Sequence, residues 1–287
     1  MGRALVVDAH VHFWDPAALR YAWLEQVPQL ERAFLPPDYF LRGDEAADAV
    51  ICVEADCDAN ERQAEVQLLR RLAEIEPRIA GIVAFVDLTN EHTWNNDLDR
   101  FAAMRAMVGV RHNIQGNAPG FCLGNAFVRG VQSVGDHALV FDVCATADQL
   151  LEVEQLVERC GATQFVLDHC GKPPIRNDAF AQWSDDLLRI AAHANVSCKL
   201  SGLFSEARAE QRTLEAMRPY AEHVLQCFGV TRLLYGSDWP VVTASGATAQ
   251  WRSVIDGLTA AWTLEDRQLF YGGNAIRLYG LELHDQA

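Results

Sequence analysis

The sequence predicts an α/β fold of the (β/α)8 barrel type, and three observations favour it. Eight short apolar runs rich in β-branched residues recur along the 287-residue chain. Segments with the three-to-four-residue apolar spacing of amphipathic helices separate these runs. No low-complexity segment, repeat or flexible linker interrupts the alternation. We therefore expect residues 1–287 to form a single barrel domain.

The apolar runs are the predicted strands, at residues 5–10, 49–54, 79–86, 108–112, 138–143, 164–169, 196–201 and 232–237. Helical spacing predicts helices at residues 61–75, 95–107, 147–160, 180–192, 214–228 and 249–261. The third of these helices opens with the capping-box-like TADQ and stops at Gly161. The long connection from 13 to 48 should include a loop over one end of the barrel.

A doubly wound nucleotide-binding sheet is the competing fold. That fold needs a glycine-rich turn after its first strand, so that the backbone can approach a pyrophosphate. Here the first strand is followed by HFWDP, with no G-x-G-x-x-G. The barrel is therefore the better interpretation.

Composition excludes several classes of partner. The formal charge is −15 and no basic run occurs, so nucleic acid and anionic membrane surfaces are not expected partners. No apolar stretch approaches the ~20 residues that cross a bilayer, and the N-terminus lacks the pattern of a signal peptide. We expect a cytoplasmic protein that acts on a small molecule, and homo-oligomerisation is left open.

The lysines and the cysteines bear on which side chains could form a functional site. Of 24 basic residues, two are lysines, Lys172 and Lys199, and both lie in segments that carry other candidate residues. The eight cysteines form no C-x-x-C pair, so reduced and mostly buried thiols are expected in place of a cysteine zinc site.

Titratable side chains gather at the carboxyl ends of the predicted strands, where barrels place their active sites. Alternation puts Asp8, His10 and His12 on one face of the first strand, provided that the strand conformation persists that far. Arg111 and His112 have opposite parity, so one of them should point inward. The same reasoning groups Glu54 with Val50 and Cys52, His169 with Phe165 and Leu167, Lys199 with Ser197 and Ser201, and Asp238 with Leu234 and Gly236.

Imidazoles and carboxylates are thus expected to converge. An H-x-H pair alone is a weak signal, Glu54 could be a structural acceptor, and Asp238 could cap a turn. Their convergence with a histidine on the sixth strand is more specific. The predicted ligands of a Zn²⁺ or Mn²⁺ ion are His10, His12, His169, Glu54 and Asp238.

Motifs along nearly the whole chain resemble the amidohydrolase superfamily, in its amidohydrolase 2 type. They are DAHVHFWDP (8–16), VEAD (53–56), RHNIQ (111–115), FDVC (141–144), LDHCGKP (167–173), CKLSGL (198–203), YGSDWP (235–240) and YGGNA (271–275). The branch that they resemble groups sugar-lactone lactonases, including hydrolases of L-fuconolactone and L-rhamnonolactone. The resemblance implies a distorted (β/α)8 barrel with His10, His12, His169 and Asp238 as site residues.

Two departures from the wider superfamily limit the metal content. No lysine stands on strands three or four to bridge two metals, and strand five ends in Asp142 where many relatives have a histidine. At most one divalent ion is therefore expected, and the resemblance includes relatives that act without added metal, so that ion could be dispensable.

The candidate site residues suit the hydrolysis of a lactone. Asp238 is the candidate base on water, His169 is a second catalytic candidate, and a divalent ion or protonated histidine would stabilise the oxyanion. The candidate substrate-binding residues are Lys199, Arg111, His112, Trp14 and Trp239. A sugar lactone is the favoured substrate. The alternatives are a muconolactone or pyrone-type lactone, decarboxylation by a metal-dependent member of the superfamily, and a catalytically silent binding protein.

Overall fold

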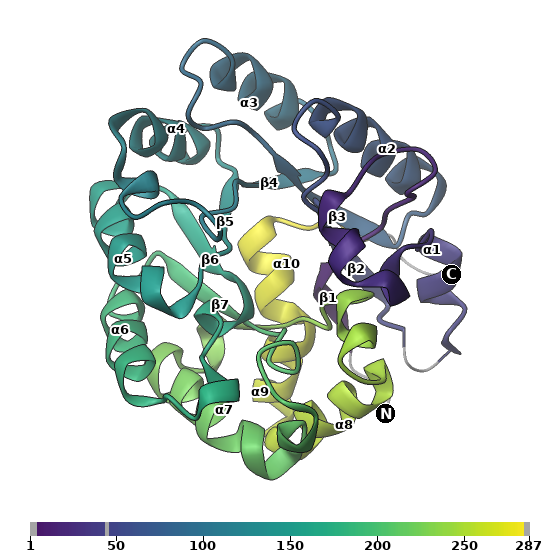
Figure 1. Cartoon of the computed structure of the whole chain (residues 1–287), viewed down its shortest axis with the longest axis vertical. Helices are drawn as coiled ribbons and strands as arrows, with labels where there is room; N and C mark the ends of the chain where they lie inside the picture. The colour runs from purple at the N-terminus through teal and green to yellow at the C-terminus, as the bar shows by residue number, and fades with distance from the viewer. Residues whose placement is uncertain (1–4, 44–45, 284–287) are drawn as a thin grey trace.

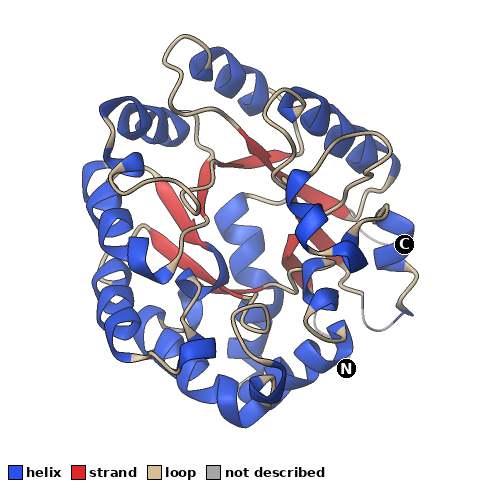
Figure 2. Cartoon of the chain, in the orientation of Figure 1, coloured by secondary structure: helices blue, strands red, loops and turns tan. Residues whose placement is uncertain are grey.

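Eight parallel strands form the centre of the molecule. The computed structural model of the chain describes residues 5–43 and 46–283. Within these residues the strands pair in sequence order in one sheet, which Figure 2 shows as the red ring. They are β1 (Val7–Val11), β2 (Ala49–Val53), β3 (Ile79–Phe85), β4 (Met107–Arg111), β5 (Val140–Val143), β6 (Gln164–Leu167), β7 (Val196–Leu200) and β8 (Leu233–Tyr235). Each lies within a few residues of its predicted position, and the (β/α)8 prediction is confirmed.

Helices surround this ring (Figure 1). The six predicted helices correspond to α2 (Arg62–Ile75), α3 (Trp94–Ala102), α5 (Leu150–Arg159), α6 (Ala181–Ala191), α7 (Leu214–Phe228) and α8 (Thr248–Leu258). The predicted capping box at Thr146 and Gln149 is present, on the short 3-10 turn that precedes α5. The 13–48 connection carries two 3-10 turns and the short helix α1 (Pro36–Phe40). The prediction omitted α4 (Asn125–Asp136), α9 (Leu264–Gln268) and α10 (Asn274–Tyr279).

Two glycines in α4 mark where the helix approaches its neighbours most closely. A Cβ at Gly130 would lie 2.8 Å from the carbonyl oxygen of Leu88, and one at Gly135 would lie 2.6 Å from Oγ1 of Thr163. Glycine costs a helix ~1 kcal/mol per residue, which weakens the local signal. The buried face of Phe127, Val131 and Val134 stabilises the helix through packing.

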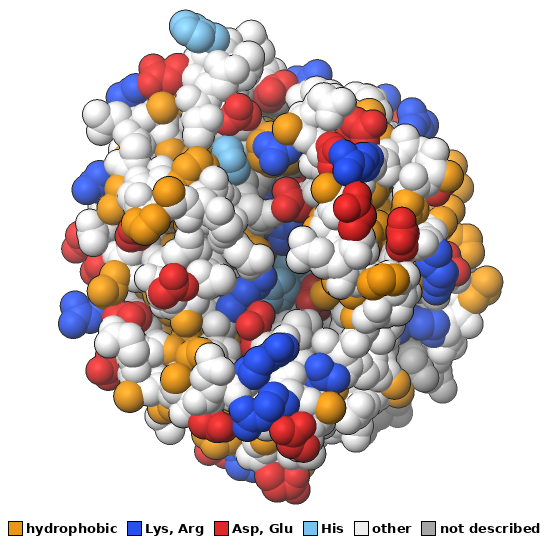
Figure 3. Space-filling model, in the orientation of Figure 1, with side chains coloured by type: hydrophobic (Ala, Val, Ile, Leu, Met, Phe, Trp, Pro, Cys, Tyr) orange, Lys and Arg blue, Asp and Glu red, His pale blue; other side chains and the backbone are white. Residues whose placement is uncertain are grey.

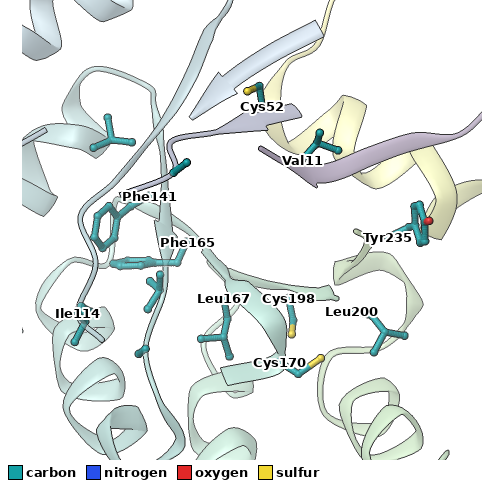
Figure 4. Close-up of a cluster of buried hydrophobic side chains, with 14 of the residues drawn as sticks. Val11, Cys52, Ile114, Phe141, Phe165, Leu167, Cys170, Cys198, Leu200 and Tyr235 are labelled. Carbon is teal, nitrogen blue, oxygen red and sulfur yellow. The ribbon is translucent and has the colours of Figure 1, made fainter. Parts of the chain in front are cut away.

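The core has two layers, one on each side of the sheet. Between the strands and the outer helices lie Phe141, Phe165, Leu167, Cys198 and Leu200 (Figure 4). Inside the ring, Val83, Val140, Val166 and Leu234 pack against Ala275 and Tyr279 of α10. Helix α10, the yellow helix at the centre of Figure 1, thus fills the end of the barrel opposite the carboxyl ends of the strands.

The seam between β1 and β8 closes just beyond β8. The backbone N–H of Asp238 donates to the carbonyl of His10 (3.0 Å), and the N–H of His12 donates to the carbonyl of Trp239 (2.8 Å). These bonds join candidate site residues from opposite ends of the chain. The hydrogen bonds that close the barrel therefore also hold the candidate site residues beside one another.

The parity prediction is confirmed on β7 and wrong on β1, β2 and β6. On β7, Lys199 faces inward while Cys198 and Leu200 pack in the outer layer. On β1 the pairing register shifts between Asp8 and Val11, so Asp8 and His10 do not share a face. The Asp8 carboxylate instead accepts from the hydroxyl of Tyr39 on α1 (2.8 Å). On β2 and β6 the outer layer holds the residues expected to share a face with Glu54 and His169, namely Val50, Cys52, Phe165 and Leu167.

The described residues also bear on the expectations about membrane spans and cysteines. No helix in these two ranges is long and apolar enough to cross a membrane. All eight cysteines are free, and seven of them are buried.

Candidate active site

A small cavity opens at the carboxyl ends of the strands. Its volume is about 260 Å³, and in Figure 3 the surface is hollowed where acidic, basic and histidine side chains gather. The lining residues are His12, Trp23, Ala55, Asp56, Arg111, Asn113, Gln115, Cys144, His169, Lys172, Gly202, Ser205, Glu206, Asp238 and Val241. A larger cavity of about 680 Å³ touches the first residues of β3 and β4, and none of the described residues that line it is a histidine. The smaller cavity is therefore the candidate active site.

Two strand ends bring His10, His12 and Asp238 together. The Nε2 atoms of His10 and His12 are 3.1 Å apart. The Oδ1 atom of Asp238 lies 3.6 Å from Nε2 of His12 and 3.9 Å from Nε2 of His10. His169 completes the group, with its Nε2 4.0 Å from the same oxygen. Four predicted site residues thus converge, and all four are buried.

The second ring nitrogen of each histidine has its own partner. Nδ1 of His12 donates to the carbonyl of Val53 (2.9 Å), because a carbonyl can only accept, and this leaves a lone pair on Nε2. Nδ1 of His10 lies 3.2 Å from Oδ1 of Asp168, and Nδ1 of His169 lies 2.9 Å from Oγ of Ser201. Metal-ligating histidines in proteins are commonly oriented by such contacts.

The electrostatics of this group favour neutral rings beside an ionised carboxylate. Burial lowers the pKa of His169 to about 4 and takes the pKa of His10 well below its ordinary value. Burial alone would raise the pKa of Asp238, but the nearby rings of His169, His12 and His10 outweigh it and hold that pKa well below its usual range. At neutral pH the Asp238 carboxylate is therefore ionised and can accept a proton.

Beneath the cavity lies a buried ion network, which we define as Glu54, Arg111, Asp142, Asp168, Lys199 and Tyr279. Nε of Arg111 donates to Oε1 of Glu54 (2.5 Å), and its Nη1 lies 3.2 Å from Oδ2 of Asp168. Nζ of Lys199 lies 2.5 Å from Oδ2 of Asp142 and 3.0 Å from Oδ1 of Asp168. These contacts join the ends of five of the eight strands, β2 and β4 to β7.

The network is closed from below by the hydroxyl of Tyr279, which donates to Oδ1 of Asp142 (2.7 Å). Burial would lower the pKa of Lys199, but Asp142 and Asp168 outweigh it and raise that pKa. Burial would likewise raise the pKa of Asp168, but Lys199, His10 and Arg111 hold it well below its usual range. Each cation of the network thus contacts two carboxylates, and each carboxylate contacts at least one cation.

This network changes the interpretation of two predicted residues. Lys199 is fully buried and does not line the cavity, so the structure does not place it as a substrate-binding group. Glu54 is bound by Arg111 and lies outside the groups of described residues whose donor atoms could share a metal ion. Arg111 does line the cavity, with its charge already matched by Glu54 and Asp168.

Three further predicted binding residues also lie off the cavity. The indole of Trp14 is fully buried and donates to the carbonyl of Arg32 (3.0 Å). Trp239 packs edge-on against Phe34. His112 accepts from the backbone N–H of Leu88 (3.2 Å) in a pocket formed by Phe85, Phe121 and Phe127. Packing against other rings, rather than exposure, explains these three positions.

The cavity wall contains polar residues that sequence reasoning did not select as site residues. They are Asp56, Asn113, Gln115, Lys172, Ser205 and Glu206. The first four lie inside the motifs VEAD, RHNIQ and LDHCGKP, and Lys172 also stood out as one of two lysines. The aromatic wall is Trp23, whose indole N–H donates to the carbonyl of Ala55 (2.9 Å).

Fold and site together define a barrel enzyme with a histidine–carboxylate centre at the strand carboxyl ends. The chain belongs to the amidohydrolase family, whose model matches residues 7–281. It is 34% identical to the L-fucono-1,5-lactonase of Burkholderia multivorans over 97% of both chains. It is 29% identical to the L-fucono-1,5-lactonase of Burkholderia ambifaria over 96% of both chains. A crystal structure of an amidohydrolase from Burkholderia multivorans with bound zinc is similar, with a TM-score of 0.87 and 32% identity over 97% of this chain and 100% of that chain.

Proposed function

We propose that the protein is a hydrolase that opens the ring of a neutral sugar lactone and releases the aldonic acid. The choice of a neutral over an anionic substrate rests on the charges of the cavity wall. Among the described residues of the wall, the carboxylates are Asp56, Glu206 and Asp238, and the cations are Arg111 and Lys172. Because Arg111 is already paired with two carboxylates, the wall offers little positive charge to a dianionic ring-cleavage lactone.

The remaining wall suits a small polyhydroxylated ring. The volume of about 260 Å³ lies below the range typical of drug-sized ligands. Asn113, Gln115 and Ser205 offer neutral hydrogen-bonding groups, and Trp23 offers an aromatic surface of the kind that packs on the apolar face of a sugar. The names of the two lactonase relatives point to the same class of substrate.

Asp238 supplies the proton transfers of the proposed reaction. Its carboxylate takes a proton as a water oxygen forms a bond to the lactone carbonyl carbon. The bond from that carbon to the ring oxygen then breaks, and the proton passes from Asp238 to the leaving alkoxide. His169, whose Nε2 is 4.0 Å from Oδ1 of Asp238, orients the carboxylate. A carboxylate with a low pKa is a weak base, so the reaction gains from any group that makes the water more acidic.

The residues present fit one divalent ion. Tetrahedral ligand atoms that lie ~2.0–2.1 Å from zinc are separated by roughly 3.3 Å, and the Nε2 atoms of His10 and His12 are 3.1 Å apart. His10, His12 and Asp238 form one group of donors within reach of a shared ion, and His10, Asp168 and His169 form another that shares His10. We infer that Zn²⁺ or Mn²⁺ is held by His10, His12 and Asp238. A bound divalent ion supplies Lewis acidity and lowers the pKa of water.

Elemental analysis of chelator-free protein tests the metal site. The expected content is one divalent ion or less per chain, falling to background in the His10→Ala/His12→Ala variant. Circular dichroism provides the control that this variant is folded. Two ions per chain, or equal content in the variant and the wild type, would contradict the assignment.

A lactone panel tests the function itself. Neutral aldono-γ- and δ-lactones are compared with muconolactone and 2-pyrone-4,6-dicarboxylate, and proton release is followed with a pH indicator. Turnover of neutral sugar lactones is expected. Turnover of the anionic lactones alone would overturn the sugar assignment, and release of CO₂ from an aromatic acid without lactone turnover would identify a decarboxylase.

A further inference from the structure

Lys172 differs from the other cations at this end of the barrel. Lys199 and Arg111 each contact two carboxylate side chains. Among the described residues, the ammonium group of Lys172 has no ion-pair partner within 4 Å, and its hydrogen-bond acceptor is the neutral side-chain oxygen of Gln115. Lys172 lines the cavity together with His169 and Asp238. It is therefore the cation of the wall whose charge is not matched by direct contact.

The backbone that presents Lys172 is strained. Four successive residues have left-handed φ values: His169 at +52°, Cys170 at +56°, Gly171 at +67° and Lys172 at +50°. Left-handed geometry is unfavourable for a non-glycine residue, because its Cβ comes too close to the following carbonyl oxygen. The N–H of Lys172 donates to the carbonyl of His169 (2.9 Å), so the segment forms one left-handed turn with three-residue spacing.

This turn has a consequence for the side chains. Residues three apart in a 3-10 turn lie above one another, so His169 and Lys172 emerge on the same side. Both side chains line the cavity, while Cys170 between them is fully buried and its thiol points to the carbonyl of Lys199 (3.4 Å). Strain of this kind persists where the surrounding structure imposes it, and it clusters at functional sites.

We propose that Lys172 is a catalytic residue whose ammonium group contacts the carbonyl oxygen of the lactone and balances the negative charge that develops there. This inference rests on the proposed lactone hydrolysis. As the water oxygen bonds to the carbonyl carbon, the π electrons of the C=O bond move onto the carbonyl oxygen. They return when the bond to the ring oxygen breaks. Lys172 keeps all its protons throughout, and Asp238 carries the proton from the water to the leaving oxygen.

A structural role is the competing explanation, and substrate hydroxyl binding is another. Lys172→Met retains the length of the side chain and removes the charge. We expect kcat to fall by ~10²–10³-fold, the range for loss of one oxyanion donor, with KM changed less than ~3-fold. The loss should be equal for lactones that lack individual hydroxyl groups. The control is Arg218→Gln, on the exposed face of α7, which should retain wild-type kcat.

Two results would overturn the assignment. One is a folded Lys172→Met protein with kcat within threefold of wild type. The other is a loss that disappears with a particular deoxy lactone, because that pattern identifies hydroxyl binding. Gln115→Glu gives an independent variant that keeps the lysine and places a carboxylate beside it. Pairing the ammonium should lower kcat about tenfold, and an unchanged kcat would also count against the proposal.

A binding measurement separates this inference from the proposed function. Calorimetry with an acyclic six-carbon aldonate, whose carboxylate derives from the lactone carbonyl, should show affinity at least tenfold weaker in Lys172→Met than in wild type. If no lactone is hydrolysed yet this difference is observed, the proposed function is wrong and the anion-binding role of Lys172 stands. Equal affinity, or no binding by the wild type, would refute that role even if lactones are hydrolysed.

Discussion

Two sets of charges lie at the same end of the barrel, one above the other. In the buried ion network, donors and acceptors are 2.5–3.2 Å apart, and Lys199, Asp142 and Asp168 are fully buried. On the cavity wall, Asp238 lies 3.6–4.0 Å from three histidine nitrogens and Lys172 faces a neutral amide. Charges in direct contact with an opposite charge hold the strand ends in place, whereas charges without such close partners remain available to a substrate.

Arg111 and His10 connect the two sets. Arg111 lines the cavity and is anchored by Glu54 and Asp168 of the network. His10 turns Nε2 toward His12 and Nδ1 toward Asp168. The geometry of the reactive group therefore depends on ions that the substrate does not touch.

The largest effect is expected from Asp238→Asn, which removes the base of the cavity wall. The amide keeps the shape of the side chain but cannot accept the proton, so kcat should fall by ~10²–10⁴-fold while the fold survives. Steady-state kinetics with a neutral aldonolactone measures the loss, and near-UV circular dichroism serves as the folding control. Near-wild-type kcat in a folded variant would remove Asp238 from the mechanism.

Lys199→Met should break the network instead. It leaves Asp142 and Asp168 without their shared cation, and loss of one partner from a buried ion pair costs about 3–5 kcal/mol of unfolding free energy. Lys172→Met is the matched control and should cost less than about 1 kcal/mol, because Lys172 has no close carboxylate in the described structure. Urea unfolding measures both, and equal losses would mean that the two sets do not differ as described.

His112 belongs to neither set, and burial is the largest cause of its pKa shift. Burial lowers its pKa to about 4, so between pH 4 and 6.5 the unfolded chain binds a proton that the folded chain does not. Unfolding free energy from this group therefore falls as pH drops below 6.5. Relative to His112→Asn, which keeps an acceptor for the N–H of Leu88, wild type should lose roughly 2 kcal/mol between pH 7 and pH 5. Parallel stability curves for the two proteins would contradict the lowered pKa.

Apart from the Lys172→Met control, the smallest loss of stability is expected from Tyr279→Phe, which removes one hydrogen bond from the network. Asp142 keeps its contact with Lys199, so the cost should be about 1.5 kcal/mol, at the lower end for a hydrogen bond to a charged group. Chemical denaturation measures it, with kcat unchanged because α10 fills the opposite end of the barrel. A fall in kcat in the folded variant would show that the network acts on the chemistry directly.

Sequence reasoning succeeded where the backbone is regular. On β7 strict alternation placed Lys199 inside and Cys198 outside, as observed. It failed on β1, β2 and β6. A register shift near His10 and a left-handed turn at His169 break the two-residue period on β1 and β6, and on β2 Glu54 does not share the outer face of Val50 and Cys52. The histidines were still identified, since residue type and position at a strand end carry that signal without parity.

The partners of a side chain were harder to predict than its place. Trp14 and Trp239 were expected to face a sugar, yet each is surrounded by other aromatic rings. Glu54 and Lys199 were expected in the site, and each is bound by a residue from another strand. Such contacts join positions far apart in the chain, so the local sequence pattern does not predict them.

The hydrogen bonds of the seam link His10 and His12 with Asp238 and Trp239, more than 200 residues later in the chain. During synthesis, the seven strands β1 to β7 can emerge and pair while the histidines still lack their carboxylate. A chain that stops before Asp238 contains His10, His12, His169 and Lys172. It lacks both the proposed base and the two hydrogen bonds that close the seam. The proposed base is thus one of the last residues of the site to be synthesised, and activity requires a nearly complete barrel.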